Sequence, residues 1–467
     1  MSTTLAFDAE LLGRYDRPGP RYTSYPTAPQ FRETFGERQF REHARRTNEE
    51  SIARSISLYV HVPYCFSPCF YCGCNRLIVR DRAKGVRYVE LLEREVAQTA
   101  RLFDLDREVI QLHLGGGTPN FLHRTELARL LRSLSAHFQL STRRDRDFSI
   151  EIDPRFVDDG DIRALADLGF NRVSLGVQDF DIEVQRAVNR VQTVEQTLTV
   201  MEACRASGMR SVNVDLIYGL PKQSLTGFEK TLETVIGAQP DRLAIYGYAH
   251  LPELFKAQRQ IEAADLPARE QRIALLELAI GTLAAAGYRY IGMDHFARPD
   301  DDLSRAQDAR RLHRNFMGYT THAGCDLIGL GVSAISHVGD SFSQNHRALP
   351  AWEGALAEER LPLWRGLELT QDDVLRADVI QQLMCHGEVD IGALENRYRI
   401  RFWDYFEDAA ESLRCLVADD LVHIEDGRII ASPRGRLLMR IIAMSFDRYL
   451  PGPAPDAKGP TRFSRVL

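Results

Sequence analysis

The chain has 467 residues, of which 44% are hydrophobic, and its formal net charge is -6 at pH 7. This length allows one large domain and a smaller one, each with its own core, and the composition argues against a disordered chain. The negative net charge provides no basic field for nucleic acid or an anionic membrane, so we expect neither as a partner.

Residues 1–56 show no clear strand pattern and are expected to form an irregular N-terminal arm, which carries the sequence RYTSYP at residues 21–26. Residues 1–7 lack the charged and apolar regions of a signal peptide, and no apolar run is long enough to cross a bilayer. We therefore expect a cytoplasmic protein.

Residues 57–364 alternate between apolar, β-branched runs and helix-period segments. This succession predicts a parallel sheet with crossover helices, either an open doubly wound sheet or a barrel, and six βα units are fewer than a full eightfold barrel needs. The predicted strands are 58–62, 109–114, 148–152, 172–177, 211–217 and 242–248, and examples of the helices are 87–102, 125–138 and 194–206.

Residues 365–450 have a mainly helical pattern, with helices expected at 371–385, 391–397 and 405–416. A hairpin is expected over residues 421–431 because Asp426-Gly427 suits a two-residue turn. We interpret this region as a small helical or winged-helix-like C-terminal domain. Residues 451–467 are rich in proline and glycine and are expected to form a loose tail.

Four of the eight cysteines, Cys65, Cys69, Cys72 and Cys74, fall within ten residues, directly after a predicted strand. This spacing indicates a metal site and not a disulfide framework. Cys65, Cys69 and Cys72 could hold three irons of a four-iron cluster, leaving one iron open for a small molecule. Two alternatives remain: structural zinc on all four cysteines, and an electron-carrying cluster with a fourth ligand.

Polar and glycine residues lie at or just after the ends of the predicted strands, where parallel α/β proteins place their sites. They include the run Gly115-Gly116-Gly117, which lets a backbone approach a ligand closely but which is also common in plain turns. Glu151, Gln178, Arg190 and Asp215 have a similar position, and each alone could be a helix cap or a loop ion pair.

A family resemblance begins at residues 59–75, YVHVPYCFSPCFYCGCN, which is similar to the radical S-adenosylmethionine (SAM) superfamily. The CGCN ending and RYTSYPT at residues 21–27 resemble the oxygen-independent coproporphyrinogen III oxidases. The resemblance continues, in order, through GGGTP (115–119), EIDP (151–154), GVQDF (176–180), DLIYGLP (215–221) and GLGVSAIS (329–336).

The resemblance implies an α/β fold, a partial (βα)6 TIM-like radical SAM barrel with an N-terminal arm and the C-terminal domain. It implies one [4Fe-4S] cluster on Cys65, Cys69 and Cys72 and two SAM molecules, with no catalytic side chain beyond these cofactors. It gives cofactor binding to Tyr59, Tyr71, Gly116, Gly117, Thr118, Glu151, Gln178, Arg190, Asp215, Ala249 and Ile335. Cys74 belongs to the family signature, but its role stays open.

The implied activity is the anaerobic oxidative decarboxylation of two propionates of coproporphyrinogen III to vinyl groups, through a 5'-deoxyadenosyl radical, which gives protoporphyrinogen IX in haem biosynthesis. Coproporphyrinogen III, SAM and a flavodoxin-type electron donor are then the expected partners of a monomer. Arg21, Tyr22 and residues 314–320 are candidate contacts for the tetrapyrrole. The alternatives are a haem chaperone of the same family, a haem-degrading radical SAM methyltransferase and a zinc-stabilised interaction protein.

Overall fold

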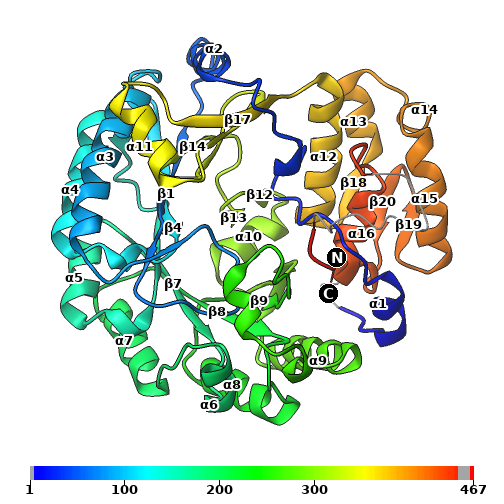
Figure 1. Cartoon of the computed structure of the whole chain (residues 1–467). Helices are drawn as coiled ribbons and strands as arrows, with labels where there is room; N and C mark the ends of the chain where they lie inside the picture. The colour runs from blue at the N-terminus through cyan, green and yellow to red at the C-terminus, as the bar shows by residue number, and fades with distance from the viewer. Residues whose placement is uncertain (1–4, 451–462, 467) are drawn as a thin grey trace. The chain divides into compact units, whose positions relative to one another are not determined.

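The computed structural model describes residues 5–450 and 463–466, and these form two compact units (Figure 1). We call residues 31–267 and 324–368 the barrel unit, and residues 1–30, 268–323 and 369–467 the terminal unit. Most of the expected tail, residues 451–462 and 467, lies outside the described residues. The terminal unit combines three separate segments of the chain, so the two units do not follow the expected domains one by one. The expected boundaries at residues 57, 365 and 451 stay a prediction.

Neighbouring parallel strands form the centre of the barrel unit, in the order β9-β8-β7-β6-β4-β1-β14. Six of these strands, all except β14, confirm the strands predicted from the sequence. They were predictable because a strand that is covered on both faces is an apolar run in the sequence. The order continues through antiparallel strands. The bounds are β1 Ile56–Val62, β4 Glu108–Gly116, β6 Asp147–Ile152, β7 Arg172–Gln178, β8 Ser211–Tyr218, β9 Arg242–Gly247, β14 Asp326–Leu330, β15 Ile335–His337, β16 Ser341–Asn345 and β17 Leu363–Glu368.

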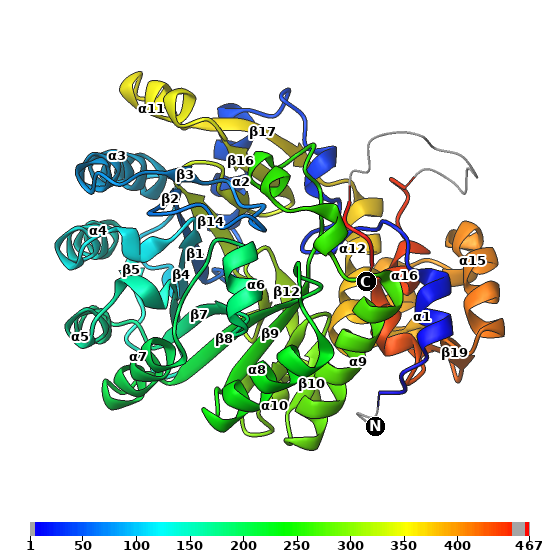
Figure 2. The same ribbon diagram turned by 60° about the horizontal axis from the view of Figure 1, so that its bottom comes forward.

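Helices cover the outer face of the parallel strands, as Figures 1 and 2 show for α3, α4, α5 and α7. The three helices predicted from the sequence are confirmed as α3, α4 and α7. The fold is therefore a partial α/β barrel of the expected class. The helices are α3 Ala83–Ala100, α4 Arg124–His137, α5 Asp159–Asp167, α6 Ile182–Ala187, α7 Val194–Ala206, α8 Leu225–Gly237 and α11 Leu349–Ala357, with the short strands β2 Tyr64–Cys65, β3 Leu77–Ile78 and β5 Gln139–Leu140.

The N-terminal segment is irregular only in part, which corrects the expectation of an irregular arm for the described residues 5–56. It contains α1 (Ala9–Tyr15) in the terminal unit and α2 (Glu37–Asn48) in the barrel unit. The sequence of α2 is rich in arginine and glutamate, but it buries Phe40, Ala44 and Thr47 on one face. Buried Arg107 holds the end of this helix by donating to Thr47 Oγ1 and Asn48 Oδ1 at 3.1 and 3.0 Å. Because most residues of α2 are polar, its packed face was not recognised in the sequence.

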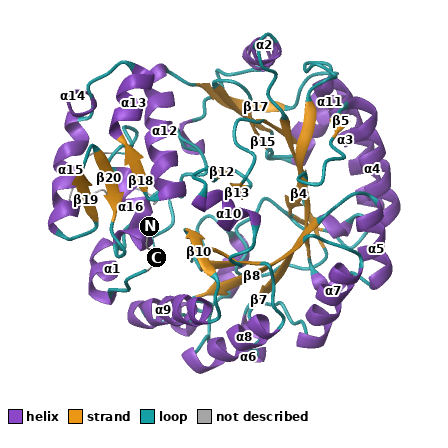
Figure 3. Ribbon diagram, turned by 180° about the vertical axis from the view of Figure 1, so that it is seen from behind, coloured by secondary structure: helices purple, strands orange, loops and turns teal. Residues whose placement is uncertain are grey.

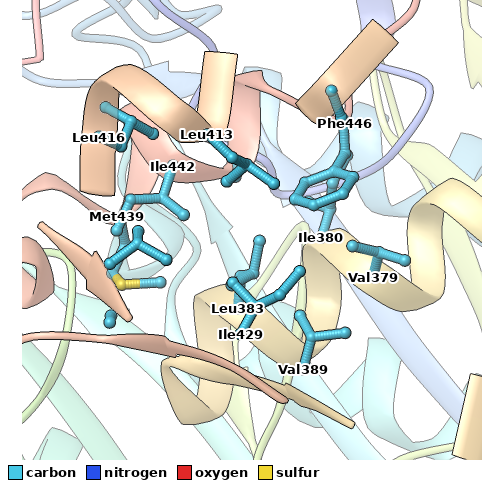
Figure 4. Packing of buried hydrophobic residues seen from close by; sticks show 14 of the residues in the cluster. Val379, Ile380, Leu383, Val389, Leu413, Leu416, Ile429, Met439, Ile442 and Phe446 are labelled. Carbon is cyan, nitrogen blue, oxygen red and sulfur yellow. The ribbon is translucent and has the colours of Figure 1, made fainter. Parts of the chain in front are cut away.

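The terminal unit has a helical core around a small antiparallel sheet of order β18-β20-β19 (Figure 3). Leu383 and Val389 pack against Leu413, Ile429 and Phe446 in this core (Figure 4). The predicted hairpin is confirmed, with Asp426 and Gly427 both at positive φ, as its tight turn requires. The elements are α9 Arg269–Ala285, β10 Arg289–Gly292, β11 His295–Ala297, α10 Asp302–Asp308, β12 His313–Asn315, β13 Gly318–Thr320, α12 Gln371–His386, β18 Glu388–Asp390, α13 Ile391–Tyr398, α14 Phe402–Tyr405, α15 Glu407–Ala418, β19 Val422–Glu425, β20 Arg428–Ala431 and α16 Met439–Met444.

Among the described residues, no helix combines the length and the apolar character that a membrane crossing requires.

Buried Glu95 on α3 fixes the turn that follows β14. Its carboxylate accepts from the amide of Gly331 (2.8 Å), from Asn345 Nδ2 (2.6 Å) and from Trp352 Nε1 (3.1 Å). Burial raises the pKa of Glu95 to about 7, although these three donors act in the opposite direction. About two turns earlier on α3, the Tyr88 hydroxyl donates to the carbonyl of His61 at 2.7 Å. The helix therefore holds the ends of two neighbouring strands together.

We predict that Glu95→Gln lowers the free energy of unfolding by about 1–3 kcal/mol, because the new amide turns an N–H group toward groups that also donate. Glu90→Gln on the same helix is the control. Its ion pairs to Arg87 and Arg129 are long, at 3.6 and 3.7 Å, so its cost should stay below about 1 kcal/mol. Urea unfolding under anaerobic conditions measures both, and equal costs would contradict a special role for Glu95.

Candidate active site

The three predicted cysteine ligands line one cavity of about 270 Å³ at the carboxyl ends of the parallel strands. Cys65 ends β2, just after β1, and is 8% exposed, while Cys69 is 9% exposed. Eight further candidate residues line the same cavity: Tyr71, Gly116, Gly117, Thr118, Glu151, Gln178, Arg190 and Asp215. Segments up to 150 residues apart in sequence thus meet here, as expected for the ends of parallel strands.

Each of the three sulfurs has a hydrogen-bond donor beside it. The Thr118 hydroxyl donates to Cys65 Sγ at 3.3 Å, Arg190 Nη1 to Cys69 Sγ at 3.6 Å, and the backbone N–H of Cys74 to Cys72 Sγ at 3.4 Å. The Cys74 thiol and the nearby Arg76 hold the pKa of Cys72 at about 5, whereas burial raises the pKa of Cys65 to about 11. The surroundings of Cys72 therefore favour the thiolate form that iron binds, whereas at Cys65 burial outweighs the Thr118 donor.

This donor set fits a four-iron cluster better than a single zinc ion. A zinc ion needs its thiolates about 2.3 Å from one point. Within the described residues, no three cysteine, histidine or carboxylate groups converge in that way. Three thiols that line one cavity instead suit a four-iron cluster, in which each thiolate binds a different iron and one iron is left to a small molecule.

A buried ion network that sequence reasoning did not assign lies against Cys69. Asp153 accepts from Arg155 Nη2 at 2.7 Å and from Arg190 Nη1 at 3.1 Å. Burial opposes the charge of Asp153, but the two guanidinium groups outweigh it and lower the pKa of that carboxyl. Arg190 also donates to the carbonyl of Gly176 at 2.6 Å. Asp153 belongs to the EIDP motif, so the signal was present in the sequence, but its partners are distant in the chain.

The glycines at the end of β4 form a concave backbone segment, which we call the cradle, and it leaves no room for a side chain on Gly116 or Gly117. Gly116 has φ +117°, and a Cβ there would lie 2.7 Å from the His61 ring. A Cβ on Gly117 would lie 2.7 Å from the backbone of Pro63, which leads into the cysteine loop. Gly117 donates to the carbonyl of Val62 at 2.8 Å. The two glycines are therefore required for the backbone of β4 to pack against the segment that leads to Cys65.

Carboxylates stand on the other side of this cradle. Glu151 accepts from the amide of Gly116 at 3.2 Å, so it is fixed beside the glycines. Asp215 accepts from Ser174 Oγ at 2.8 Å and from Asn213 Nδ2 at 2.9 Å. Burial raises the pKa of Asp215 to about 6. Gln178, with φ +69°, ends β7 next to them. The wall thus offers acceptors for hydroxyl or ammonium groups of a small ligand.

Three candidate residues are not among those that line the cavity: Tyr59, Ala249 and Ile335. Tyr59 stacks on His113, with ring centroids 5.9 Å apart, and its hydroxyl lies 3.0 Å from His61 Nδ1. Ala249 is linked to the cavity through Gln258, whose Nε2 donates to the carbonyls of both Ala249 and Tyr71. Ile335 begins β15, after the turn that Glu95 holds. Their binding roles stay a prediction.

The candidate tetrapyrrole contacts all belong to the terminal unit. Tyr22 is 3% exposed and donates to Asp447 at 3.0 Å, so in this structure it is a core residue. Arg21 pairs with Asp294, and Arg314 lies over the ring of Tyr319 at 4.7 Å. Contacts of Arg21 and Arg314 with a ligand stay a prediction.

Two family models match the chain: the radical SAM superfamily over residues 59–235 and the HemN C-terminal domain over residues 369–438. A protein of Pseudomonas aeruginosa named oxygen-independent coproporphyrinogen III oxidase is 48% identical over the full length of both chains. The protein of that name from Escherichia coli is 45% identical over 99% of this chain and 98% of its own. A solved structure described as coproporphyrinogen III oxidase (HemN) from Escherichia coli, a radical SAM enzyme, superposes with a TM-score of 0.91, at 44% identity, covering 96% of this chain and 100% of the other.

Proposed function

The chain belongs to the family of oxygen-independent coproporphyrinogen III oxidases, and on that premise we propose that it decarboxylates coproporphyrinogen III in haem biosynthesis. Each of two propionates loses carbon dioxide, one proton and two electrons, and becomes a vinyl group. The observation that carries this function is the 45–48% identity along the whole chain to enzymes of that name. The cavity with three thiols agrees with it, because SAM chemistry needs an iron that no side chain occupies.

When bound to Cys65, Cys69 and Cys72, the cluster supplies the electron that cleaves SAM reductively. The chain's own residues bind SAM and orient it. The backbone of Gly116 and Gly117, with Thr118, forms the cradle for the methionyl end of SAM, and Glu151 accepts from an N–H of its amino group. The guanidinium of Arg190 is always charged, and Asp153 offsets the cost of burying it; Arg190 can therefore hold a carboxylate of SAM and still donate to Cys69.

The remaining cofactor roles follow from the chemistry of each side chain. Gln178 and Asp215 accept from or donate to ribose hydroxyls, while Tyr71, Ala249 and Ile335 pack on adenine faces of two SAM molecules. Tyr59 supports the methionyl end through its contacts with His61 and His113. A flavodoxin-type electron donor, a monomeric state and a cytoplasmic location belong to the same proposal. Eight cysteines without a disulfide among the described residues agree with a reducing compartment.

The test is an anaerobic reaction of the reconstituted protein with SAM, dithionite and coproporphyrinogen III. We expect loss of two carboxyl groups from the porphyrin, with matching amounts of carbon dioxide and 5'-deoxyadenosine. Cys69→Ala should abolish all three products, and Cys415→Ser, at an exposed cysteine, should leave them unchanged. Formation of 5'-deoxyadenosine without any change in porphyrin mass would contradict the proposed substrate.

A second prediction concerns Asp215. Because burial raises its pKa to about 6, the carboxylate form that accepts a ribose hydroxyl is lost as the pH falls below that value. SAM affinity should therefore weaken about tenfold between pH 7.5 and 5, a free energy of about 1.4 kcal/mol. In Asp215→Asn the affinity should be weak throughout and show no such pH dependence.

Anaerobic calorimetry at constant cluster content measures this binding. Asp167→Asn, at an exposed position near the end of α5, is the matched control and should keep the wild-type profile. If Asp215→Asn also keeps that profile, Asp215 has no part in SAM binding.

A further inference from the structure

An exposed apolar strand lies directly beside the cysteine loop. Leu77 and Ile78, the two residues of β3, are 40% and 41% exposed, and because neighbours in a strand point to opposite faces, both faces of β3 reach solvent. Val86, on the first turn of α3, is 38% exposed as well. Figure 2 shows β3 next to β2 and α3. Native proteins rarely leave an apolar edge strand uncovered, so this one is a candidate for a protein contact.

Strand β3 also lies directly beside the strand that carries Cys65, a candidate cluster ligand. It pairs with β2 in parallel, with Ile78 opposite Cys65. The amide of Val79 donates to the carbonyl of Cys65 at 3.0 Å. Paired strands lie about 4.8 Å apart, so a molecule that touches β3 is separated from the Cys65 backbone by a single strand.

The surface around the strand is basic, in contrast to the net charge of -6 of the whole chain. Residues 76–84 contain four cationic side chains and one acidic one, a formal charge of +3. The acidic residue, Asp81, is occupied as an acceptor for the amide of Ala83. Arg80 and Lys84 are exposed, and neither makes an ion pair within the described part of the chain. Arg82 lies 4.9 Å from the centre of the Phe66 ring, the residue after Cys65.

We propose that this surface, Leu77, Ile78, Arg80, Arg82 and Lys84, is the docking face for an acidic protein that carries single electrons; we call it the donor face. The proposal rests on the proposed function, since the reaction consumes one external electron for each SAM cleaved. The donor is oxidised by one electron and the cluster is reduced by one, beside Cys65. Apolar β3 supplies the centre of the contact and the cations its rim, the usual anatomy of a transient interface.

A second surface near the cluster is less suited to an acidic partner. Arg155, which reaches to 4.0 Å from Cys69 Sγ, also lines an open cavity of about 780 Å³. That cavity combines Arg124 and Arg163 with Asp158, Asp159 and Glu195, so its charges largely cancel. Charge complementarity therefore favours the donor face.

The test compares two double charge reversals. Arg80→Glu with Lys84→Glu changes the donor face, and Arg132→Glu with Lys230→Glu makes the same change in net charge at exposed positions on α4 and α8. Stopped-flow spectroscopy follows cluster reduction by reduced flavodoxin, used as the acidic donor. At low ionic strength, we expect the bimolecular rate constant to fall at least tenfold for the donor-face variant and less than about twofold for the control. Dithionite, which needs no docking, should drive SAM cleavage equally in all of them.

Equal rate constants for the two variants would overturn the proposal, as would a wild-type rate that does not fall with added salt. So would a tenfold loss in Arg124→Glu with Arg163→Glu, because the donor would then use the other surface. Carbodiimide cross-linking of the wild-type holoenzyme to flavodoxin decides without any variant: a link at Lys84 supports the donor face, and a link at Lys222 or Lys230 instead contradicts it. If dithionite drives no SAM cleavage in the wild-type protein, the proposed function itself has failed.

Discussion

Three cysteine thiols line one cavity of the barrel unit, and a cluster bound there would need them as thiolates, so negative charge has to be stabilised inside the fold. Arg190, 6% exposed, meets this need by donating to Cys69, Asp153 and the carbonyl of Gly176 at once. A buried guanidinium costs free energy unless it is paired, and a buried carboxylate does too. Arg190 and Asp153 therefore offset each other's cost of burial. Because Arg155 also donates to Asp153, the three side chains together carry one net positive charge beside the sulfur. The loop that carries Cys69 can then pack closely against strands β6 and β7.

Close packing and hydrogen bonds to buried groups also organise the rest of the cavity and the strands that lead to it. Glycines replace side chains where the backbone of β4 meets that of the cysteine loop, and Glu151 accepts from the Gly116 amide that this packing exposes. On the outside of the barrel unit, α3 uses Tyr88 and Glu95 to tie the end of β1 to the turn after β14. These hydrogen bonds hold the strand that leads to the cysteine loop in place, while the segment from Cys69 to Arg80 is partly exposed. An accessible edge beside the candidate cysteine ligands would suit a centre that receives electrons from outside.

Local features were readable from the sequence, and features that depend on distant contacts were not. The cysteine spacing, the six apolar strands and the Asp426-Gly427 turn are each encoded within a few residues, and the structure contains them. Helix α2 was missed because its surface residues are mostly arginine and glutamate. Strand β14 was missed because its five residues follow a long stretch of short elements. The pairing of Asp153 with Arg190 joins positions 37 residues apart, so periodicity gave no sign of it.

The central claim is that Cys65, Cys69 and Cys72 hold a four-iron cluster whose fourth iron binds SAM. Electron–nuclear double resonance on the dithionite-reduced protein, with SAM carrying ¹⁵N in its amino group, measures this directly. The account predicts a ¹⁵N hyperfine signal from the labelled nitrogen, which is replaced by a ¹⁴N signal when unlabelled SAM is used. An intact, reduced cluster in the presence of bound labelled SAM but without that ¹⁵N signal would contradict it.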